Sequence, residues 1–525
     1  MKTINMKIVF IKAVLYCIVT VSFAQSPGIN VLVKERSIGR FTETQEEIIV
    51  KEYIFPEQVY HSYIDTISKS ITFQLRGLSN NGKWMNNRGK IVLYDLVGEK
   101  IKWSKSISYK TNRIQQYGNT IILTAGGLSG QSYCLNIETG KKMWKVQTNI
   151  YIVDPVNQIG IGYEFKTPRE NSTLEGINLK NGKKLWQREL KNEYGWNDVL
   201  LLNDTTWMIV ASGLHVVNIH DGSGWDYNTV TGDKDYKAAT AKNVTGVALG
   251  LLTGTYLIFG PDLVTGIASN VFFDSTGFYF ASKEKISQVR KDQGAWWHLL
   301  PEKMTSKSSI FAKADSLYMV NHGYAFKNQR LIDYGTPFFA SFSKENGEKL
   351  FFQTFNTKKN PIYDFKILNN YLLLLFRDKI VRCSLIDGST IFEMGINYHE
   401  LGELKRFVGN NIYIDAPNSS LTNLVLSDIS KQFVFTSNDK VLIFDSKLDI
   451  VGYIDLKRLY VALMKLQDFK LVVNEYQTII LNADNKKVVE MDITLKSAVL
   501  IGNKLYSIQN NSFFEIDLTN LIGQP

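Results

Sequence analysis

Six histidines are the first residues in this sequence that could bind a metal ion or carry a proton in a reaction. They are spread along the chain as His61, His215, His220, His298, His322 and His399. No two of them have the i, i+4 spacing that places two zinc ligands on one face of a helix. His215 and His220 lie five residues apart on an expected strand, so their side chains point to opposite faces. The histidine pattern therefore does not predict a metal site.

Nucleophile and cofactor motifs are also missing from the sequence. There is no Gly-x-Ser-x-Gly elbow, no phosphate-binding Gly-Lys-Ser/Thr loop and no dinucleotide-binding Gly-x-Gly-x-x-Gly. Cys134 and Cys383 precede turn glycines by six and five residues, which places them on similar strands of different repeats. We expect both thiols to be buried and reduced. No catalytic or cofactor-binding residue is assigned from the sequence.

Lysines at equivalent turn positions are a second candidate for chemistry. They are Lys141, Lys142, Lys183, Lys184, Lys349, Lys486 and Lys487. If the chain is a closed ring of repeats, its symmetry puts them on one rim, where they would attract an acidic protein, a phosphate-bearing glycolipid or an anionic polymer. The alternative is that lysines suit exposed turns and protect sheet edges. A third candidate is carbohydrate binding by the aromatic residues Trp196, Trp296 and Trp297.

The elements that would position these side chains are short strands in a repeating pattern. Each copy has alternating apolar residues, a polar turn, a basic pair and a large apolar residue, and the clearest turn glycines, Gly140 and Gly182, lie 42 residues apart. The turn glycines are Gly98, Gly140, Gly182, Gly222, Gly347 and Gly388, and the aromatic residues after them are Trp103, Trp144, Trp186, Trp225, Phe351 and Phe392. We expect the glycines to adopt a left-handed backbone and the aromatic residues to pack between neighbouring repeats.

A period of about 40 residues with four strands per repeat predicts an all-β fold, a β-propeller of four-stranded antiparallel blades. Weaker copies of the turn continue toward the C-terminus and bring the candidates to nine. Closed propellers typically have four to eight blades, so we expect about eight, with seven as the alternative. A strand from the start of the chain, at 29–33 or 71–75, is expected to complete the last blade.

The repeats ending in Met143-Trp144 and Leu185-Trp186 resemble the repeat of pyrroloquinoline-quinone-type propellers, which reads roughly apolar-Asp/Asn-x-x-Thr/Asn-Gly-Lys-x-x-Trp. Good matches cover residues 85–190, and fair ones reach about 395. The resemblance implies the propeller fold. It also raises a dehydrogenase that binds pyrroloquinoline quinone and calcium at the ring centre. The adjacent cysteine pair found in many such enzymes is absent here.

The N-terminus has the pattern of a secretory signal peptide. Three lysines precede an uncharged apolar run, and Ala24 ends a segment of small residues, so we expect cleavage after residue 24. Removing residues 1–24 changes the formal charge from +10 to +7. No block of five or more basic residues occurs, so the sequence does not predict a nucleic-acid partner. Residues 25–525 are expected to form one propeller domain with an enlarged Gly-rich, apolar insertion around 226–285. Its segment 244–260 is interrupted by glycines and does not predict a membrane span.

These observations favour a non-catalytic, monomeric propeller that binds a protein partner in the cell envelope, either in the periplasm or on the outer membrane, with an extracellular location as the alternative. In this reading the chain is similar to the propeller subunit of the machinery that assembles outer-membrane β-barrels, and no cofactor is expected. The alternatives are the alcohol or sugar dehydrogenase that uses pyrroloquinoline quinone with calcium, and a carbohydrate-binding propeller.

Overall fold

The computed structural model describes residues 22–26, 29–79, 85–108, 112–117, 120–125, 130–164, 173–235, 262–290, 293–355, 360–416, 420–495 and 497–522. Within these ranges the chain consists almost entirely of antiparallel β-strands, which confirms the all-β propeller fold. Eight four-stranded sheets follow one another along the described chain, and two more four-stranded units lie within a 12-stranded sheet. We number these units 1 to 10 in chain order. The sequence predicted about eight blades, with seven as the alternative, so the described strands form more units than expected.

Units 1 to 4 are each made of four consecutive strands. Unit 1 contains β4 (Gln58–Asp65), β5 (Ser70–Leu78), β6 (Met85–Asp95) and β7 (Lys100–Ser108), and unit 2 contains β8 (Asn112–Tyr117), β9 (Thr120–Ala125), β10 (Gln131–Asn136) and β11 (Lys142–Val146). Unit 3 contains β12 (Thr148–Asp154), β13 (Ile159–Glu164), β14 (Thr173–Asn178) and β15 (Lys184–Glu189), and unit 4 contains β16 (Asp198–Asn203), β17 (Thr206–Ala211), β18 (Gly213–Asn218) and β19 (Gly224–Asn228).

Units 5 to 8 repeat this order, two of them with insertions. Unit 5 contains β22 (Phe272–Asp274), β23 (Gly277–Ala281), β24 (Lys285–Arg290) and β25 (Gln293–Leu299), and unit 6 contains β26 (Ser308–Lys313), β27 (Ser316–Asn321), β30 (Phe338–Ser343) and β31 (Lys349–Thr354). Unit 7 contains β32 (Asp364–Leu368), β33 (Tyr371–Leu375), β34 (Lys379–Ser384) and β35 (Thr390–Gly395), and unit 8 contains β36 (Leu404–Phe407), β39 (Gln432–Thr436), β40 (Lys440–Phe444) and β41 (Ile450–Asp455).

The last two units bring the two ends of the described chain together. Unit 9 contains β42 (Leu459–Leu466), β43 (Phe469–Val473), β44 (Thr478–Leu481) and β45 (Lys487–Met491), and unit 10 contains β46 (Ala498–Ile501), β47 (Lys504–Gln509), β48 (Ser512–Asp517) and β3 (Glu47–Ile54). Strand β2 (Ile29–Phe41) pairs with both β3 and β45, and β1 (Ser22–Ser26) pairs with β2. The strand that completes unit 10 is therefore β3, while residues 29–33 belong to β2 and residues 71–75 to β5 of unit 1.

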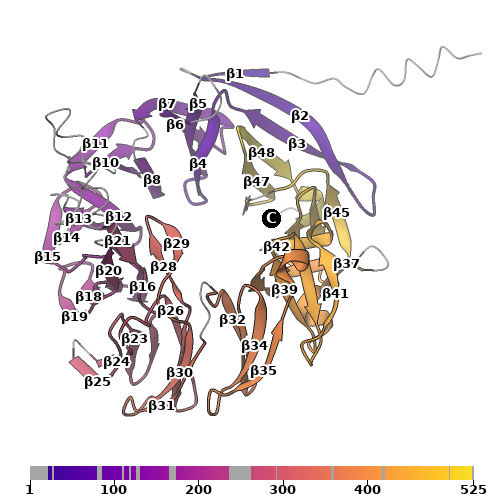
Figure 1. The fold of residues 1–525 in the computed structure, drawn as a ribbon. Helices are drawn as coiled ribbons and strands as arrows, with labels where there is room; N and C mark the ends of the chain where they lie inside the picture. Colours follow the sequence, from indigo (N-terminus) through magenta and orange to yellow (C-terminus); the bar gives the residue numbers. More distant parts are fainter. Residues whose placement is uncertain are drawn as a thin grey trace, which may run out of the picture.

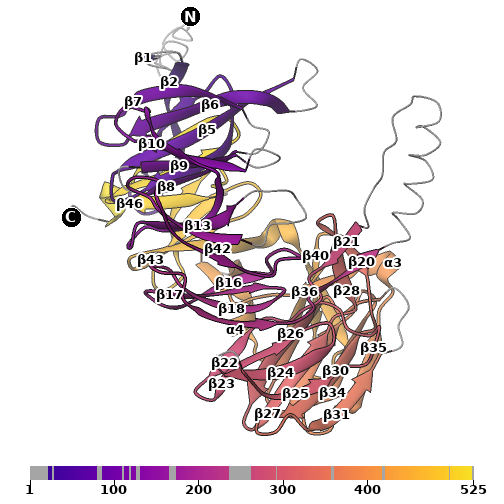
Figure 2. The ribbon, with the colours of Figure 1, turned by 90° about the vertical axis from the view of Figure 1, so that its left-hand side faces the viewer.

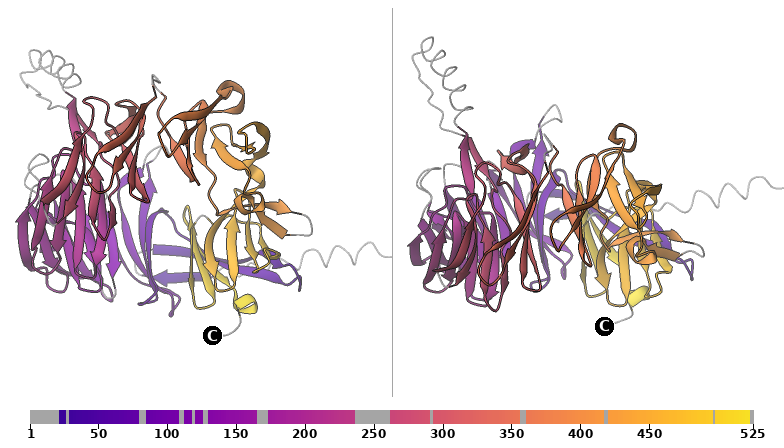
Figure 3. Two further views of the ribbon diagram at one scale, coloured as in Figure 1. Left: turned by 90° about the horizontal axis from the view of Figure 1, so that it is seen from below. Right: turned by 60° about the horizontal axis from the view of Figure 1, so that its bottom comes forward.

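The units surround the middle of the molecule, with the first strand of each on the inside and the fourth on the outside (Figure 1). Figures 2 and 3 show the yellow C-terminal strands beside the indigo strands of the chain start. The second and third strands of each unit are buried on both faces, as in β13 and β17, because the neighbouring units cover them. The outermost strands, such as β15, are exposed except at one aromatic residue.

Apolar clusters between successive units close the ring. One cluster joins Trp186 of unit 3 to Trp207 of unit 4, and another joins Phe73 of unit 1 to Phe513 of unit 10, whose rings lie 5.3 Å apart. The hairpin of β37 (Ile412–Ala416) and β38 (Ser420–Asn423), inserted in unit 8, fills the space between units 8 and 9. Since one small sheet cannot cover both of its faces, these shared clusters are what make the repeats stable together.

A small additional sheet combines strands from two distant segments. It contains β20 (Gly232–Asp235), β21 (Asp262–Thr265), β28 (Tyr324–Lys327) and β29 (Arg330–Asp333). Strands β20 and β21 belong to the insertion that the sequence analysis expected around 226–285, and its apolar segment 244–260 lies outside the described residues. The expected signal peptide also lies outside them except for its last residues, 22–24, which belong to β1.

The described helices are single turns, namely α3 (Tyr398–Leu401), α4 (Leu424–Ser427), η2 (Leu456–Arg458) and α5 (Thr519–Ile522). In the part of the chain that the structure describes, no helix is long and apolar enough to span a bilayer.

Candidate functional site

The aromatic residues of the repeat dock onto the outer turns of the next unit. The indole N–H of Trp144 donates a hydrogen bond to the carbonyl of Leu179 at 2.9 Å. Gly182, three residues further on, has a φ of +72°, and a Cβ atom there would lie 2.7 Å from the Trp144 ring. Gly182 is therefore required both by its backbone conformation and by the close approach of the indole.

The same contact recurs between other units. The indole N–H groups of Trp103, Trp186 and Trp296 donate to the carbonyls of Ile137 at 2.5 Å, Ile219 at 2.7 Å and Lys344 at 2.9 Å, and their rings lie over Gly140, Gly222 and Gly347. The ring of Phe351 lies over Gly388 in the same way. Trp296, which the sequence analysis considered for carbohydrate binding, is thus buried in a docking contact.

Three of the predicted repeat residues are placed differently. In the first outer turn Glu99, with a φ of 48°, adopts the left-handed conformation instead of Gly98. Trp225 is half-buried and packs on Phe278, with ring centroids 5.9 Å apart. Phe392 is 37% exposed. The outer turn of unit 8, residues 445–449, contains no glycine for Phe392 to dock onto, and the outer turn of unit 5 lies partly outside the described residues.

The seven candidate lysines all lie where the third strand of a unit passes into the fourth. Because the strands of each unit alternate in direction, these turns share one end of the ring. Lys184 forms an ion pair with Glu175, and Lys487 pairs with Asp415 at 3.3 Å and Glu490 at 3.2 Å. Lys349 and Lys486 are exposed.

Units 2 and 3 carry a group of exposed lysines on adjoining turns and outer strands, which we call the basic patch. It comprises the exposed lysines Lys141, Lys142, Lys145, Lys180 and Lys183. None of these five ammonium groups has an ion-pair or hydrogen-bond partner within the described residues. Between them lie Met143, 48% exposed, and Leu185, 43% exposed. Docking of Trp144 onto the turn at residues 179–182 holds the two halves of the patch together.

The histidines and cysteines do not meet in one site. His215 is fully buried, and its Nδ1 lies 2.7 Å from Asp226, which Arg188 also pairs at 2.8 Å. Cys134 and Cys383 are free, buried thiols in units 2 and 7, and burial raises the pKa of each to about 12. Among the described residues, no group of three or more His, Cys, Asp or Glu side chains could hold a metal ion.

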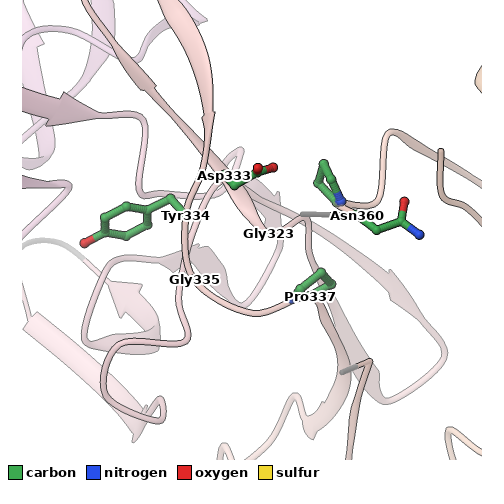
Figure 4. A pocket seen from close by; sticks show the side chains of 7 residues that line it. Gly323, Asp333, Tyr334, Gly335, Pro337 and Asn360 are labelled. Atoms are coloured by element: carbon green, nitrogen blue, oxygen red, sulfur yellow. The ribbon is translucent and has the colours of Figure 1, made fainter. Parts of the chain in front are cut away.

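A cavity of about 130 Å³ lies where the β28–β29 hairpin meets the segment before unit 7. Its walls are Gly323, Asp333, Tyr334, Gly335, Pro337, Asn360 and Pro361. Figure 4 shows the side chains of Asp333 and Tyr334 pointing to opposite sides. The Tyr334 hydroxyl donates to Asp233 at 2.5 Å, and Lys283 pairs with the same carboxylate at 2.9 Å, so Tyr334 ties the hairpin to β20.

His322 lies directly beneath this cavity and is almost fully buried. Its Nδ1 lies 2.9 Å from the carbonyl of Ile362, which can only accept, so Nδ1 carries the proton. Nε2 then accepts a hydrogen bond from the Ser309 hydroxyl at 2.9 Å. Burial lowers the pKa of His322 to about 4, so its imidazole is a weak base toward Ser309 at neutral pH. The His322 imidazole thus links Ser309 of unit 6 to the segment before unit 7.

Other ionisable groups with shifted pKa values lie on the inner strands around His322. Burial lowers the pKa of Lys307 and Lys366 and raises the pKa of Asp364, which accepts backbone hydrogen bonds from Phe365 and Phe407 at 2.8 Å. Perturbed groups gather at functional sites in many proteins. Here the adjoining cavity has room for only a few water molecules or a small ion.

A second cavity, of about 560 Å³, lies at one end of unit 1 and has the size of a small-molecule site. It is lined by Glu57, Gly77, Arg88, Gly89, Lys90, Ser106 and Ile107. The sequence analysis did not identify either cavity. The signal that it could have used here is a pair of glycines within expected strands, each next to an arginine, at 76–77 and 88–89.

The strand order and the docking contacts define the chain as a β-propeller. No protein-family model matches it, and no curated protein matches it. Among solved structures it is similar to BamB from Moraxella catarrhalis, with 12% identity over 77% of this chain and 96% of that one and a TM-score of 0.27. It is also similar to apo AztD from Citrobacter koseri, with 10% identity over 70% and 91% and a TM-score of 0.29. The C-terminal WD40 domain of Sif2 matches with 12% identity over 78% and 97% and a TM-score of 0.30.

Proposed function

We propose that this chain is an exported, non-catalytic propeller that binds an acidic protein partner in the cell envelope through the basic patch. The observation that carries the proposal is the arrangement of that surface. Five lysines without partners in the described chain surround two exposed apolar side chains on adjacent outer strands. A rigid surface of this kind suits a macromolecular partner, because the charges steer the encounter while Met143 and Leu185 supply apolar contact.

The N-terminal residues support export, since three lysines followed by an uncharged apolar run and Ala24 are typical of a signal peptide. The docking of Trp103 and Trp144 onto Gly-Lys turns supports the resemblance to quinone-type propellers at the level of the repeat. Packing between units explains that contact. The resemblance therefore supports a shared scaffold and not a shared catalytic activity.

Binding of a fluorescent poly-L-glutamate peptide to the purified protein tests the proposed surface. We expect saturable binding that weakens steeply with salt, because exposed charges are screened. The double variant Lys142→Glu/Lys183→Glu is expected to weaken binding about tenfold or more, equivalent to about 1.4 kcal/mol.

The matched control is Lys303→Glu/Lys447→Glu, which reverses two exposed lysines in units distant from the patch. It has the same change in net charge and should bind nearly as well as the wild type. An equal loss in both double variants would mean that net charge, and not the patch, binds the peptide, and the proposal would fail.

A further inference from the structure

The cavity in unit 1 is lined by two charged residues of opposite sign, Glu57 and Arg88. The Oε2 atom of Glu57 is shielded from solvent and has no hydrogen-bond partner within the described structure. Arg88 lines the same cavity with its side chain exposed, and no ion pair or hydrogen bond of its guanidinium group occurs among the described residues. A buried carboxylate oxygen without a donor is costly, so a cationic donor from a ligand would be stabilised there.

The backbone leaves room between these two groups. The ladder between β5 and β6 shifts register between Arg76 and Leu78, so Gly77 lies opposite a bulge in β6 that contains Arg88. Gly89 lies opposite Arg76 in that ladder. Neither glycine has a side chain to fill the cavity, so a ligand backbone can approach the sheet closely at both positions. Lys90 and its cross-strand neighbour Ser106 complete the same wall.

The strand order gives the separation of the two backbone positions from which these charged side chains extend. Glu57 immediately precedes β4, and Arg88 lies on β6, two strands away in the order β4-β5-β6-β7. Neighbouring strands lie about 4.8 Å apart, so the two positions are separated by about 10 Å. An extended chain spans about 3.4 Å per residue, so three residues match this distance, whereas the two charges of a single amino acid are too close together.

We infer that the cavity of unit 1 binds a short peptide with free ends, its ammonium group at Glu57 and its carboxylate at Arg88. The ligand is a zwitterion about three residues long, held at both ends and lying across the glycines of β5 and β6. Lys90 adds positive charge on the carboxylate side, while Ser106 offers a hydroxyl group to the peptide backbone. The inference is independent of the proposed function, because unit 1 and the basic patch use different residues.

The experiment is isothermal titration of the purified protein with trialanine and three related compounds. N-acetyl-trialanine lacks the ammonium group, trialanine amide lacks the carboxylate, and alanine has both charges too close together. We expect trialanine to bind and to raise the melting temperature, and each of the other three to bind about tenfold or more weakly, because each loses one charge-assisted contact.

Two variants test which residue binds which end of the peptide. Glu57→Gln should weaken trialanine about tenfold while leaving N-acetyl-trialanine unchanged, and Arg88→Gln should do the same for trialanine while leaving trialanine amide unchanged. The controls Glu302→Gln and Arg330→Gln alter exposed residues outside the cavity and should bind as the wild type does. Failure of trialanine to bind, or equal binding of trialanine and N-acetyl-trialanine, would overturn the inference. Either outcome leaves the binding of poly-L-glutamate to the basic patch unaffected. Failure of this inference can therefore be told apart from failure of the proposed function.

Discussion

At the scale of the residue, the outer-turn glycines are subject to two constraints that can be separated. Gly182 has a positive φ and also lies beneath the Trp144 ring, whereas Gly195 has a similar φ of +77° with no atom within 4 Å of an added Cβ. The two positions therefore share the backbone conformation and differ in the close approach of a neighbour. They form a natural pair for measuring the cost of the docking contact.

We predict that Gly195→Ala lowers the free energy of unfolding by about 1 kcal/mol, the cost of a left-handed alanine. Gly182→Ala should cost about 2–4 kcal/mol, since displacing the indole adds the cost of overpacking. Thermal or denaturant unfolding of both variants measures the difference. Equal losses would show that Trp144 does not stabilise the turn.

The lowered pKa of His322 makes the stability of the fold depend on pH. Its pKa is about 4 in the folded protein instead of the usual 6.5, so the unfolded chain takes up a proton first. The contribution of His322 to stability is complete above pH 6.5 and is lost as the pH falls from 6.5 toward 4, by about 3 kcal/mol over that interval.

Melting temperatures of the wild type and of His322→Gln between pH 7 and pH 4.5 check this expectation. His322→Gln should have a lower melting temperature than the wild type at pH 7. Its melting temperature should fall less as the pH is lowered to 4.5. His399→Gln, at an exposed position, is the control and should follow the wild type. A variant with an undiminished pH dependence would contradict the role given to His322.

The thiols provide a simpler test at the same scale. Burial raises the pKa of Cys134 and Cys383 to about 12, and the thiolate is the form that reacts. We expect negligible alkylation of either cysteine by iodoacetamide at pH 8 in the folded protein and complete alkylation after unfolding. Rapid labelling of the folded protein would contradict the burial of these residues.

At the scale of the element, the ring is closed by strand β3 and by ion pairs at the same seam. Glu99 in the outer turn of unit 1 accepts from Lys51 of β3 at 2.5 Å and from Lys504 of β47 at 3.0 Å. Lys504 also pairs with Glu515 at 2.6 Å. These contacts link the first repeat to the last one and to the N-terminal strand.

We predict that Glu99→Gln lowers the free energy of unfolding by about 1 kcal/mol, because two partly exposed ion pairs are lost together. Glu138 is more exposed and forms an ion pair with Lys102. Glu138→Gln removes this pair and should change the free energy of unfolding by less than about 0.5 kcal/mol. Urea unfolding at low and high salt compares the two. A larger loss of stability in Glu138→Gln than in Glu99→Gln would contradict the claim that the ion pairs of Glu99 stabilise the junction of units 1 and 10.

The sequence predicted the repeated outer turns because the distance from an aromatic residue to the next turn glycine is nearly constant. It is 37 residues for Trp103, 38 for Trp144, 36 for Trp186 and 37 for Phe351. For Trp296 it is 51, because the β28–β29 hairpin is inserted before Gly347. An inserted hairpin has the same alternating pattern as a repeat, so the sequence alone did not separate β28–β29 or β37–β38 from the blades.

Other parts of the fold depend on contacts between distant segments. The turns of units 1, 8 and 9 use Glu99, Leu448 and Asn485 in place of a left-handed glycine, so they carry little sequence signal. The pairing of β20–β21 with β28–β29, and of β3 with β48, joins segments that local patterns cannot relate. The cavity beside the β28–β29 hairpin arises where two such segments meet, whereas the cavity of unit 1 lies among the consecutive strands β4 to β7.

At the scale of the whole molecule, the propeller presents the basic patch at the end of the ring that carries the outer turns. The docked tryptophans fix the positions of the turns relative to each other, so the lysines of units 2 and 3 form one surface rather than two mobile turns. A rigid, charged and partly apolar surface binds a partner with little loss of conformational entropy. This is how the packing of the repeats would lead to the proposed function.

The most direct test is photo-cross-linking in the native host, with a photoreactive amino acid in place of Met143 or Leu185. Tyr476, which is 56% exposed in a turn at the other end of unit 9, is the control position. We predict one discrete adduct from both patch positions, none from position 476, and loss of the adduct when Lys142→Glu/Lys183→Glu is added. No adduct from the patch, or the same adduct from all three positions, would contradict a partner-binding surface on units 2 and 3.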